Sequence, residues 1–417
     1  MERFTLNQKE WQRYQVITLL LEGRCNTQEA ATTIGISERQ TIRLKKKVQN
    51  QGVKGVIHGN QRRNTGRGLS EEVKDQISAL AQHKYRGFND THLWEKLTEV
   101  EGFLLSRETL RKILREKSLP PARKRRPPKH RRRRPPRPQE GMLIQVDGSP
   151  HDWLEGRGHW LCLVGAIDDA TGRVLWARFF PAETSEAYMH LIRGIITRYG
   201  IPLAFYSDRH SIFYVTRKEW TLEEELAGRQ QPTQVGQVLE RLGIELILAN
   251  SPQAKGRVER LWNTFQDRLV SELRLAGVET LEEANRVLER FLEDYNRRFC
   301  HPALEPQSAF RKVPRGLDID RAISFTYQAT VGNDNTVRVK GRVFDIPPGQ
   351  NRCSYARAKV MVHRLLNEEW RIYYQDRLLL RIPPGEDASK AVYGEKRESP
   401  IDKRKVCLAS KPLSPKG

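Results

Sequence analysis

The stretch LIQVDGSPHDWL, residues 143–154, places a single acid at the end of an apolar run. Leu143, Ile144 and Val146 predict a buried strand, and Asp147 follows them directly. The residues Gly-Ser-Pro at 148–150 then predict the end of that strand, because glycine and proline disfavour strand interiors. A lone buried carboxylate is costly unless it is paired, hydrogen-bonded or bound to a metal ion. The rest of the chain must therefore supply partners for Asp147.

Strand and helix signals alternate after residue 140. Apolar runs predict five strands, at residues 142–146, 159–169, 174–180, 202–208 and 244–249. Amphipathic spacing predicts two helices, at residues 185–199 and 251–273. Three strands in series, followed by strands separated by helices, predict a mixed five-stranded α/β sheet. Asp208 ends the fourth strand. Neighbouring strand ends in such a sheet bring acids together, so we expect Asp208 to lie near Asp147.

A third acid, Glu259, lies on the long helix that begins near Ser251 and Pro252. The buried stripe of this helix is formed by Val258, Leu261, Trp262, Phe265 and Leu269. Glu259 lies at the margin of that stripe, where it can face the rim of the sheet. Three carboxylates without a histidine or cysteine partner suit Mg²⁺ or Mn²⁺. Two such ions, ~4 Å apart, can activate a water or a 3′-hydroxyl against a phosphodiester.

Other polar and aromatic residues near these strands have structural interpretations. We expect Asp168 and Asp169 to cap the turn after the second strand. Trp160, Trp176 and Trp262 are interpreted as core residues, and His301 is interpreted as structural.

Composition indicates a polyanionic partner. The formal net charge is +22 and the basic residues are clustered, which favours nucleic acid over a charge carried for solubility alone. No apolar run approaches the ~18 residues that a membrane span requires, and the first residues lack the apolar core of a signal peptide. Five scattered cysteines without a CxxC pair argue against a zinc module and a disulfide framework, so a reducing cytoplasm is expected.

The stretch from Cys25 to Gly52 is typical of a helix-turn-helix. Asn26 or Thr27 can cap a first helix, Gly35 suits the turn, and Ser37 forms a capping box for the next helix. That second helix carries the expected DNA contacts Arg39, Gln40, Arg43 and Lys46. The alternative is an ordinary helical hairpin with a solvated basic face. A second unit follows, in which Ser70 and Ser106 can cap helices and Arg107 and Arg111 are the expected DNA contacts.

Residues 120–139 predict an extended basic linker. Ten Lys or Arg and no acid fall between Arg123 and Arg137, and seven prolines fall between Pro120 and Pro138. Like charges prevent such a segment from packing on itself. It can instead track a phosphate backbone, and its expected contacts are Arg125, Arg131, Arg132, Arg133 and Arg134. A nuclear-localisation role also fits the composition, but no other feature indicates a nucleus.

The order and flanks of the three acids resemble the DDE transposase and retroviral integrase superfamily, and in particular bacterial insertion-sequence transposases. The resemblance spans residues 141–310 and is carried by the motifs QVDGSPHDWL, GAIDDATGRVLWARF, FYSDRHSIF, NSPQAKGRVERLWNTFQDRL and YNRRFCHPALEPQSAF. It implies an RNase H-like core in which Asp147, Asp208 and Glu259 are catalytic and hold two Mg²⁺ or Mn²⁺ ions. It also implies that His210, Lys255 and Arg257 contact DNA near the cut.

Two features depart from the pattern of the superfamily. Asp208 and Glu259 are 51 positions apart, which is longer than usual. The extra length falls in residues 215–237, which we expect to form an exposed insertion. No His-His-Cys-Cys zinc module precedes the core, which favours a transposon enzyme over a retroviral integrase.

The chain is accordingly expected to be a multidomain transposase of the bacterial cytoplasm, associated with the nucleoid. The expected parts are a helix-turn-helix domain at 1–65, a second helix-turn-helix or winged-helix domain at 66–119, the linker at 120–139, the RNase H-like core at 140–314, a small β-barrel at 315–384 and a disordered tail at 385–417. The expected partners are double-stranded DNA, as transposon ends and target, and further copies of the chain on that DNA, with no membrane. The alternatives are a catalytically silent regulator and a metal-dependent nuclease without joining activity.

Overall fold

The computed structural model describes residues 6–57, 69–122, 134–249, 256–349 and 353–385. The chain forms two compact units, Met1–Ala79 and Leu80–Gly417, each described here by itself. None of the helices in the described ranges is long and apolar enough to cross a membrane. The described cysteines, Cys25, Cys162, Cys300 and Cys353, form no disulfide.

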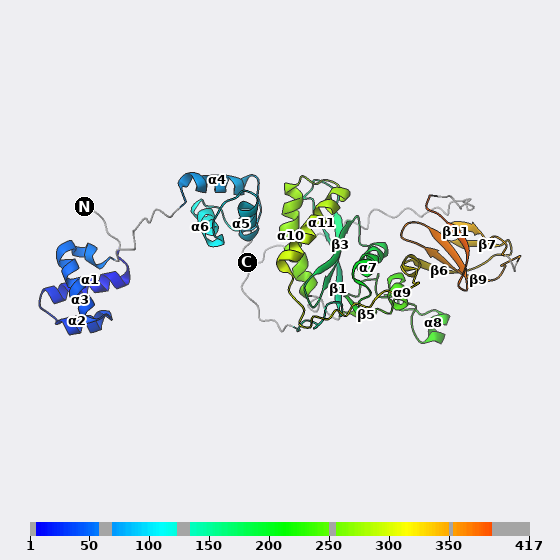
Figure 1. Ribbon diagram of the computed structural model, residues 1–417, viewed down its shortest axis with the longest axis horizontal. Helices are drawn as coiled ribbons and strands as arrows, with labels where there is room; N and C mark the ends of the chain where they lie inside the picture. The colour runs from blue at the N-terminus through cyan, green and yellow to red at the C-terminus, as the bar shows by residue number, and fades with distance from the viewer. Residues whose placement is uncertain (1–5, 58–68, 123–133, 250–255, 350–352, 386–417) are drawn as a thin grey trace, which may run out of the picture. The chain divides into compact units, whose positions relative to one another are not determined.

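The first unit contains a compact group of helices (Figure 1), formed by α1 (Gln8–Leu21), α2 (Thr27–Ile34), α3 (Glu38–Gln51) and the 3-10 helix η1 (Gly52–Val56). Most of α4 (Glu71–Gln82) also belongs to this unit. A small apolar core joins α1, α2, α3 and η1 through Ile17, Leu20, Ala30, Val48 and Val56.

The junction between α2 and α3 has the two caps and the glycine turn that the sequence predicts. Asn26 caps α2 and Ser37 caps α3, each in a reciprocal capping box. Gly35 ends α2 with a φ of 67°, a left-handed conformation that glycine adopts without steric cost. The local signals therefore predicted both helix starts and the turn between them.

In the second unit, short helices precede the sheet. They are α5 (Asp90–Glu99) and α6 (Arg107–Glu116). Ser106 caps α6 as expected, since its hydroxyl accepts from the backbone N–H of Thr109 at 3.1 Å. Helix α5 is joined to a later helix by a buried bidentate ion pair, in which Arg268 donates to both carboxylate oxygens of Glu95 at 2.7 and 3.0 Å. A buried ion pair requires such close geometry to offset its desolvation.

The central sheet is mixed and five-stranded, with the order β3-β2-β1-β4-β5. Its strands are β1 (Ile144–His151), β2 (Leu161–Asp168), β3 (Val174–Phe180), β4 (Ala204–Ser207) and β5 (Glu245–Leu248). The pairs β1–β2 and β2–β3 are antiparallel, whereas β1–β4 and β4–β5 are parallel. The mixed five-stranded sheet expected from the sequence is therefore present.

The expected break of the first strand at residues 148–150 was wrong. Strand β1 continues to His151, and Pro150 pairs with Cys162 of β2. The reason is that β1 pairs with β4 only at Ile144 and Gln145, so beyond that point it has β2 as its one paired neighbour in the described sheet. Proline is tolerated on such an edge because its missing N–H leaves no ladder bond unmade. Asp147 therefore lies inside β1.

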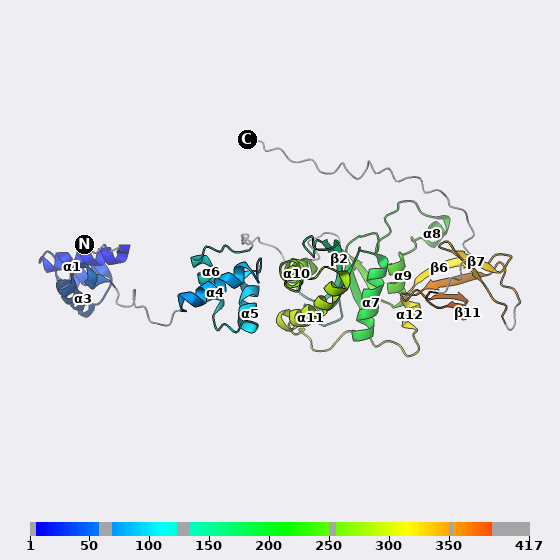
Figure 2. The same ribbon diagram turned by 90° about the horizontal axis from the view of Figure 1, so that it is seen from above.

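Helices cover both faces of the sheet (Figures 1 and 2). One face packs against α7 (Ser185–Tyr199) and α9 (Gln234–Arg241), and the other packs against α10 (Gly256–Leu275) and α11 (Leu281–Phe299). The described part of α10 begins at Gly256, so the expected cap at Ser251 and Pro252 lies outside the described residues.

The expectation that residues 215–237 form an exposed insertion was partly wrong. The segment contains α8 (Leu222–Ala227) and the first turn of α9, in which Val235 is buried against the core. Glu224 is also buried, where it pairs with Arg217. Leu222 and Leu226 are exposed, as expected. The apolar residues in the second half of the segment lie on the buried face of α9, which packs against β5 and α7.

The C-terminal part is β-rich, but its described strands do not form one closed sheet. After the short helix α12 (Ile319–Ala322), four strands pair in the order β11-β10-β9-β6, and two pair separately as β7-β8. Their bounds are Phe325–Thr330 for β6, Thr336–Val339 for β7, Arg342–Asp345 for β8, Lys359–Arg364 for β9, Trp370–Tyr374 for β10 and Arg377–Ile382 for β11. The expected closed barrel is not confirmed.

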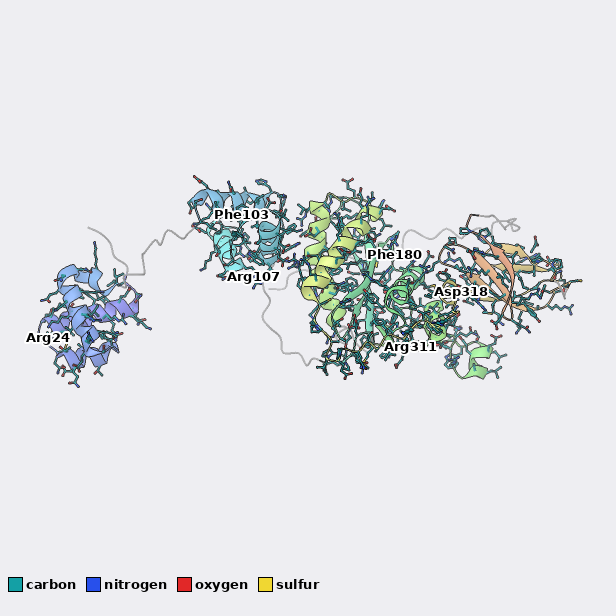
Figure 3. All side chains as sticks on the ribbon, viewed as in Figure 1. Arg24, Phe103, Arg107, Phe180, Arg311 and Asp318 are labelled. Carbon is teal, nitrogen blue, oxygen red and sulfur yellow. The ribbon has the colours of Figure 1, made fainter. Side chains whose placement is uncertain are left out.

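Two labelled side chains lie on the segment that leads from the core into this part, and each fixes its own side of the junction (Figure 3). Arg311 donates to the backbone carbonyls of Leu242 and Gly243 at 3.1 and 2.7 Å. Asp318 caps α12 and also accepts from Arg371 of β10 at 2.7 Å.

Candidate active site and DNA-contact residues

Asp147 lies within β1, and Asp208 directly follows the adjacent parallel strand β4. Gln145 of β1 pairs with Tyr206 of β4, and this last pair lies two residues before each of the two acids. Asp208 directly follows β4, is exposed, and accepts from the backbone N–H of His210 at 3.1 Å. The sequence-based expectation that these two acids lie near one another is consistent with this register.

Glu259 lies in the first turn of α10, which is held against β1 by two hydrogen bonds. The indole Nε1 of Trp262 donates to Oδ2 of Asp147 at 3.0 Å. The backbone N–H of Val258 donates to Oε1 of Gln145 at 3.3 Å. Trp262 follows Glu259 by one helical turn, so both bonds connect the part of α10 that carries Glu259 to the strand that carries Asp147.

Trp262 has a second role that sequence reasoning missed. It is buried, with 7% of its surface exposed, as expected of a core residue. A buried indole N–H needs an acceptor, however, and here the acceptor is a candidate catalytic carboxylate. The sequence signal for this role was the position of Trp262, an aromatic residue one helical turn after Glu259.

A fourth carboxylate, Glu183, lies against Gly148, the residue that follows Asp147, and was not predicted. Its Oε1 accepts from the hydroxyl of Tyr188 at 2.6 Å. Burial raises the pKa of Tyr188 well above its usual range, and the charges of Glu183 and Asp147 add to the effect. A Cβ added at Gly148 would lie 2.5 Å from Cδ of Glu183, so this glycine permits the close approach. Glu183 follows β3 closely, and an acid after a strand was the signal that sequence reasoning used for Asp208.

Cys162 is a further titratable group near these acids. Burial raises the pKa of its thiol to about 12, with the charge of Glu183 as the next cause. The thiol is therefore protonated at neutral pH and is a poor nucleophile.

The two acids after β2 behave differently from one another. Asp168 caps the turn as expected, since its carboxylate accepts from Thr171 and from the backbone N–H of Gly141. Burial raises the pKa of Asp168. The expectation that Asp169 caps the same turn was wrong. Its carboxylate pairs with Arg134 at 2.7 Å and with Arg257 at 2.8 Å.

The expected DNA contacts on α3 lie mostly on one surface. Arg39, Arg43 and Lys46 are exposed and recur at intervals of four and three residues, which places them on one face of the helix. The side-chain oxygen of Gln40 accepts from the backbone N–H of Ser37 at 3.2 Å, so it serves the cap. On α6, Arg107 is exposed in the first turn (Figure 3), and Arg111 forms an exposed pair with Glu108 at 3.1 Å.

Other expected DNA contacts have structural partners or lie outside the described residues. His210 takes part in the turn after β4, where its Nδ1 accepts from the backbone N–H of Ile212 at 3.4 Å. Arg134 and Arg257 both pair with Asp169. The contacts that lie outside the described residues are Arg125, Arg131, Arg132, Arg133 and Lys255.

The donor set at this edge of the sheet consists of oxygens. Asp147, Asp208 and Glu259 offer carboxylates, which hard divalent cations prefer over nitrogen or sulfur. Within the described ranges, no group of three or more His, Cys, Asp or Glu side chains is already gathered at metal-binding distance. The chemistry of the donors fits Mg²⁺ or Mn²⁺, and the carboxylates would have to draw together around it.

Comparison with known proteins gives a consistent set of relatives. Residues 240–308 match the family model described as an integrase core domain. The chain is 31% identical over 381 residues to the transposase for insertion sequence IS1202 of Streptococcus pneumoniae, which covers 83% of this chain and 80% of that protein. It is 38% identical over 300 residues to y4bF of Sinorhizobium fredii, whose name assigns it to the transposases. That match covers 72% of this chain but 64% of the relative, so the chain spans less than two thirds of its length.

A solved structure shares a weaker likeness. The catalytic core domain of BIV integrase is 22% identical, and the match covers 38% of this chain and 85% of that chain. Its TM-score is 0.28, which is too low to support a conclusion.

Proposed function

The chain belongs to the DDE transposase and integrase superfamily, among the relatives of bacterial insertion-sequence transposases, and from this premise we propose that it binds transposon ends and catalyses metal-dependent cleavage and joining of DNA strands. The hydrogen bond from Trp262 to Asp147 carries the proposal, because it joins the helix that bears Glu259 to the strand that bears Asp147. The register of β1 and β4 supports it, because the last pair of these strands lies two residues before both Asp147 and Asp208.

Asp147, Asp208 and Glu259 would hold two Mg²⁺ or Mn²⁺ ions. The chemistry that such a pair supplies is activation of an attacking oxygen and stabilisation of the leaving oxygen of a phosphodiester. The neighbouring residues prepare the site. Trp262 orients one oxygen of Asp147, and Gln145 holds the N-terminal turn of α10. Glu183 adds negative charge beside Gly148, which favours a cation at this edge of the sheet.

The helical part of the first unit is proposed to recognise double-stranded DNA at the transposon ends. Helix α3 presents Arg39, Arg43 and Lys46 on one exposed face, and a recognition helix of a helix-turn-helix enters the major groove in this way. Arg107 and Arg111 on α6 would provide a second contact, and the basic linker at 120–139 would follow the phosphate backbone. Joining two ends requires more than one copy of the chain, so we propose a homo-oligomer on DNA.

The proposed division of labour follows the expected domains. Residues 1–65 and 66–119 would bind DNA, residues 140–314 would form the RNase H-like core, and the β-rich residues 315–384 would assist binding or assembly. The core proposal is supported by the mixed sheet with helices on both faces.

The test is incubation of the purified protein with Mg²⁺ and labelled duplexes taken from the DNA that flanks its gene on either side. Joined products are expected from the flanking duplexes and not from scrambled duplexes of equal length. Cleaved but unjoined products would instead indicate a nuclease. Specific binding without any cleavage, in Mg²⁺ and in Mn²⁺, would indicate a silent regulator.

A further inference from the structure

Asp169 is a buried carboxylate that holds together segments far apart in the sequence. None of its surface is exposed, and it directly follows β2. Its Oδ1 accepts from Nε2 of Gln145 at 2.8 Å and pairs with Nε of Arg257 at 2.8 Å. The same oxygen accepts from Arg134 at 2.7 Å, and Oδ2 accepts from the backbone N–H of Arg137 at 2.8 Å.

These partners lie next to the candidate active site. Gln145 precedes Asp147 by two residues on β1, and Arg257 precedes Glu259 by two residues on α10. Gln145 also accepts from the backbone N–H of Val258, so Asp169, Gln145 and the first turn of α10 form one connected network. Arg134 and Arg137 belong to the end of the basic segment 120–139.

The charge of Asp169 is the centre of this network. A buried carboxylate is stable only where cations and N–H donors surround it, and here two arginines and two neutral donors do so. Removing the charge of Asp169 would break its ion pair with Arg257 and weaken its hydrogen bond with Gln145. The first turn of α10 would then lose part of the network that attaches it to β1.

We propose that Asp169 is a positioning residue that sets Glu259 relative to Asp147 and ties the end of the basic segment to the same point. Asp169 does not touch the reacting atoms in this account; it acts through Gln145 and Arg257. The inference rests on the proposed function, because Glu259 and Asp147 matter as partners only in a metal-dependent site.

The test compares Asp169→Asn with Asp168→Asn in the full-length protein. Both change a buried acid to its isosteric amide, but the partners of Asp168 lie in the turn and at Gly141. Hydrogen exchange of peptides covering residues 256–262 should be faster in Asp169→Asn than in the wild type, and unchanged in Asp168→Asn. Equal exchange in Asp169→Asn and the wild type would overturn the proposal.

A second readout is the binding of Mn²⁺ alone, followed by electron paramagnetic resonance of the free ion. Asp169→Asn should weaken binding by about 10–100-fold, the usual effect of losing a residue that orients metal ligands. Asp168→Asn should not weaken it. Unchanged Mn²⁺ affinity in Asp169→Asn would overturn the inference, whereas no Mn²⁺ binding and no joining by the wild type would overturn the proposed function itself.

Arg257→Gln keeps the test decisive if Asp169→Asn does not fold. It removes the α10 partner while leaving the carboxylate, and it should speed exchange in residues 256–262 and weaken Mn²⁺ binding. In the double variant Asp169→Asn/Arg257→Gln, the loss of affinity should be smaller than the sum of the two single losses, because both act through one contact. Fully additive losses would contradict a shared role.

Discussion

The indole of Trp262 donates a hydrogen bond of 3.0 Å to Oδ2 of Asp147, across 115 positions of sequence. This bond joins α10 to β1 at the point where each element carries a candidate catalytic acid. Trp262, which the sequence predicted only as a core residue, therefore also supports the candidate site. Its loss therefore has a consequence for metal binding that an ordinary core substitution does not have.

Trp262→Phe should retain the aromatic packing and lose the donor. The carboxylate of Asp147 would then be less firmly oriented, so the affinity for Mn²⁺ should fall by about 10–100-fold. Trp153→Phe is the matched control, because Trp153 is also buried and donates to the carbonyl of Ser149 at 3.0 Å rather than to an acid. Titration with Mn²⁺ checks both variants. Equal Mn²⁺ affinity in Trp262→Phe and the wild type would show that the indole of Trp262 does not support the site.

Gly148→Ala should strain the site through Glu183. The added Cβ would lie 2.5 Å from Cδ of Glu183, so either the side chain or the strand must move. The displaced atoms are the flexible end of Glu183, so the cost should be at the low end of overpacking, about 1 kcal/mol of unfolding free energy. Urea unfolding measures the loss, and Gly148→Ala should cost less in a Glu183→Ala background than in the wild type. An equal cost of Gly148→Ala in both backgrounds would place the strain elsewhere.

Much of the fold could be predicted from local signals. Helix α7 and strand β3 have the predicted bounds because hydrophobic spacing and the Thr184 cap act within a few residues. The continuation of β1 through Pro150 could not be predicted, because it depends on which neighbours the strand pairs with. The separate sheets of the C-terminal part depend on pairing in the same way.

Local sequence signals mark the three candidate acids but not the residues that support them. Asp147 and Asp208 are marked by apolar runs that precede them, and Glu259 by the buried stripe of its helix. Glu183 and Asp169 support the candidate site through contacts between segments that are far apart in the sequence. The hydrophobic periodicity of a single helix or strand does not predict such contacts. Arg257 was predicted to contact DNA, yet its pairing with Asp169 gives it a structural partner.

Stability should fall as the pH is lowered from about 6.5 towards 4 because of His363. Burial lowers the pKa of this imidazole to about 4, and Arg241 is the next cause. The unfolded chain binds a proton near pH 6.5. Since the unfolded state then holds more protons than the folded state, the stability present above pH 6.5 is lost as the pH falls through this window. The loss is roughly 3 kcal/mol at most.

The comparison for this prediction is His363→Gln. Its unfolding free energy should change less between pH 7 and pH 4.5 than that of the wild type, measured by urea unfolding at each pH. Glu369 titrates in a lower window, because Arg381 and then Arg371, against the opposing effect of burial, lower its pKa to about 2. Identical pH profiles for the variant and the wild type would mean that His363 does not govern the window.

Arg43→Ala should weaken binding to transposon ends more than binding to random DNA. Arg43 is exposed on α3 between Arg39 and Lys46, and one good base contact is worth about 1–3 kcal/mol. Competition binding on flanking and scrambled duplexes measures the difference. Lys54→Ala, outside α3, is the control and should weaken both duplexes alike. Equal weakening of both duplexes by Arg43→Ala would assign Arg43 to the phosphate backbone.

Asp147, Asp208 and Glu259 are proposed to form one metal-dependent site. The most direct measurement is the yield of joined DNA in Mg²⁺ for Asp147→Asn, Asp208→Asn and Glu259→Gln, with end binding measured on the same preparations. Each variant should bind the ends like the wild type and yield no joined product, because recognition is proposed to lie on α3 and chemistry on the carboxylates. Normal joining by any one variant, at wild-type Mg²⁺, would contradict the claim for that residue.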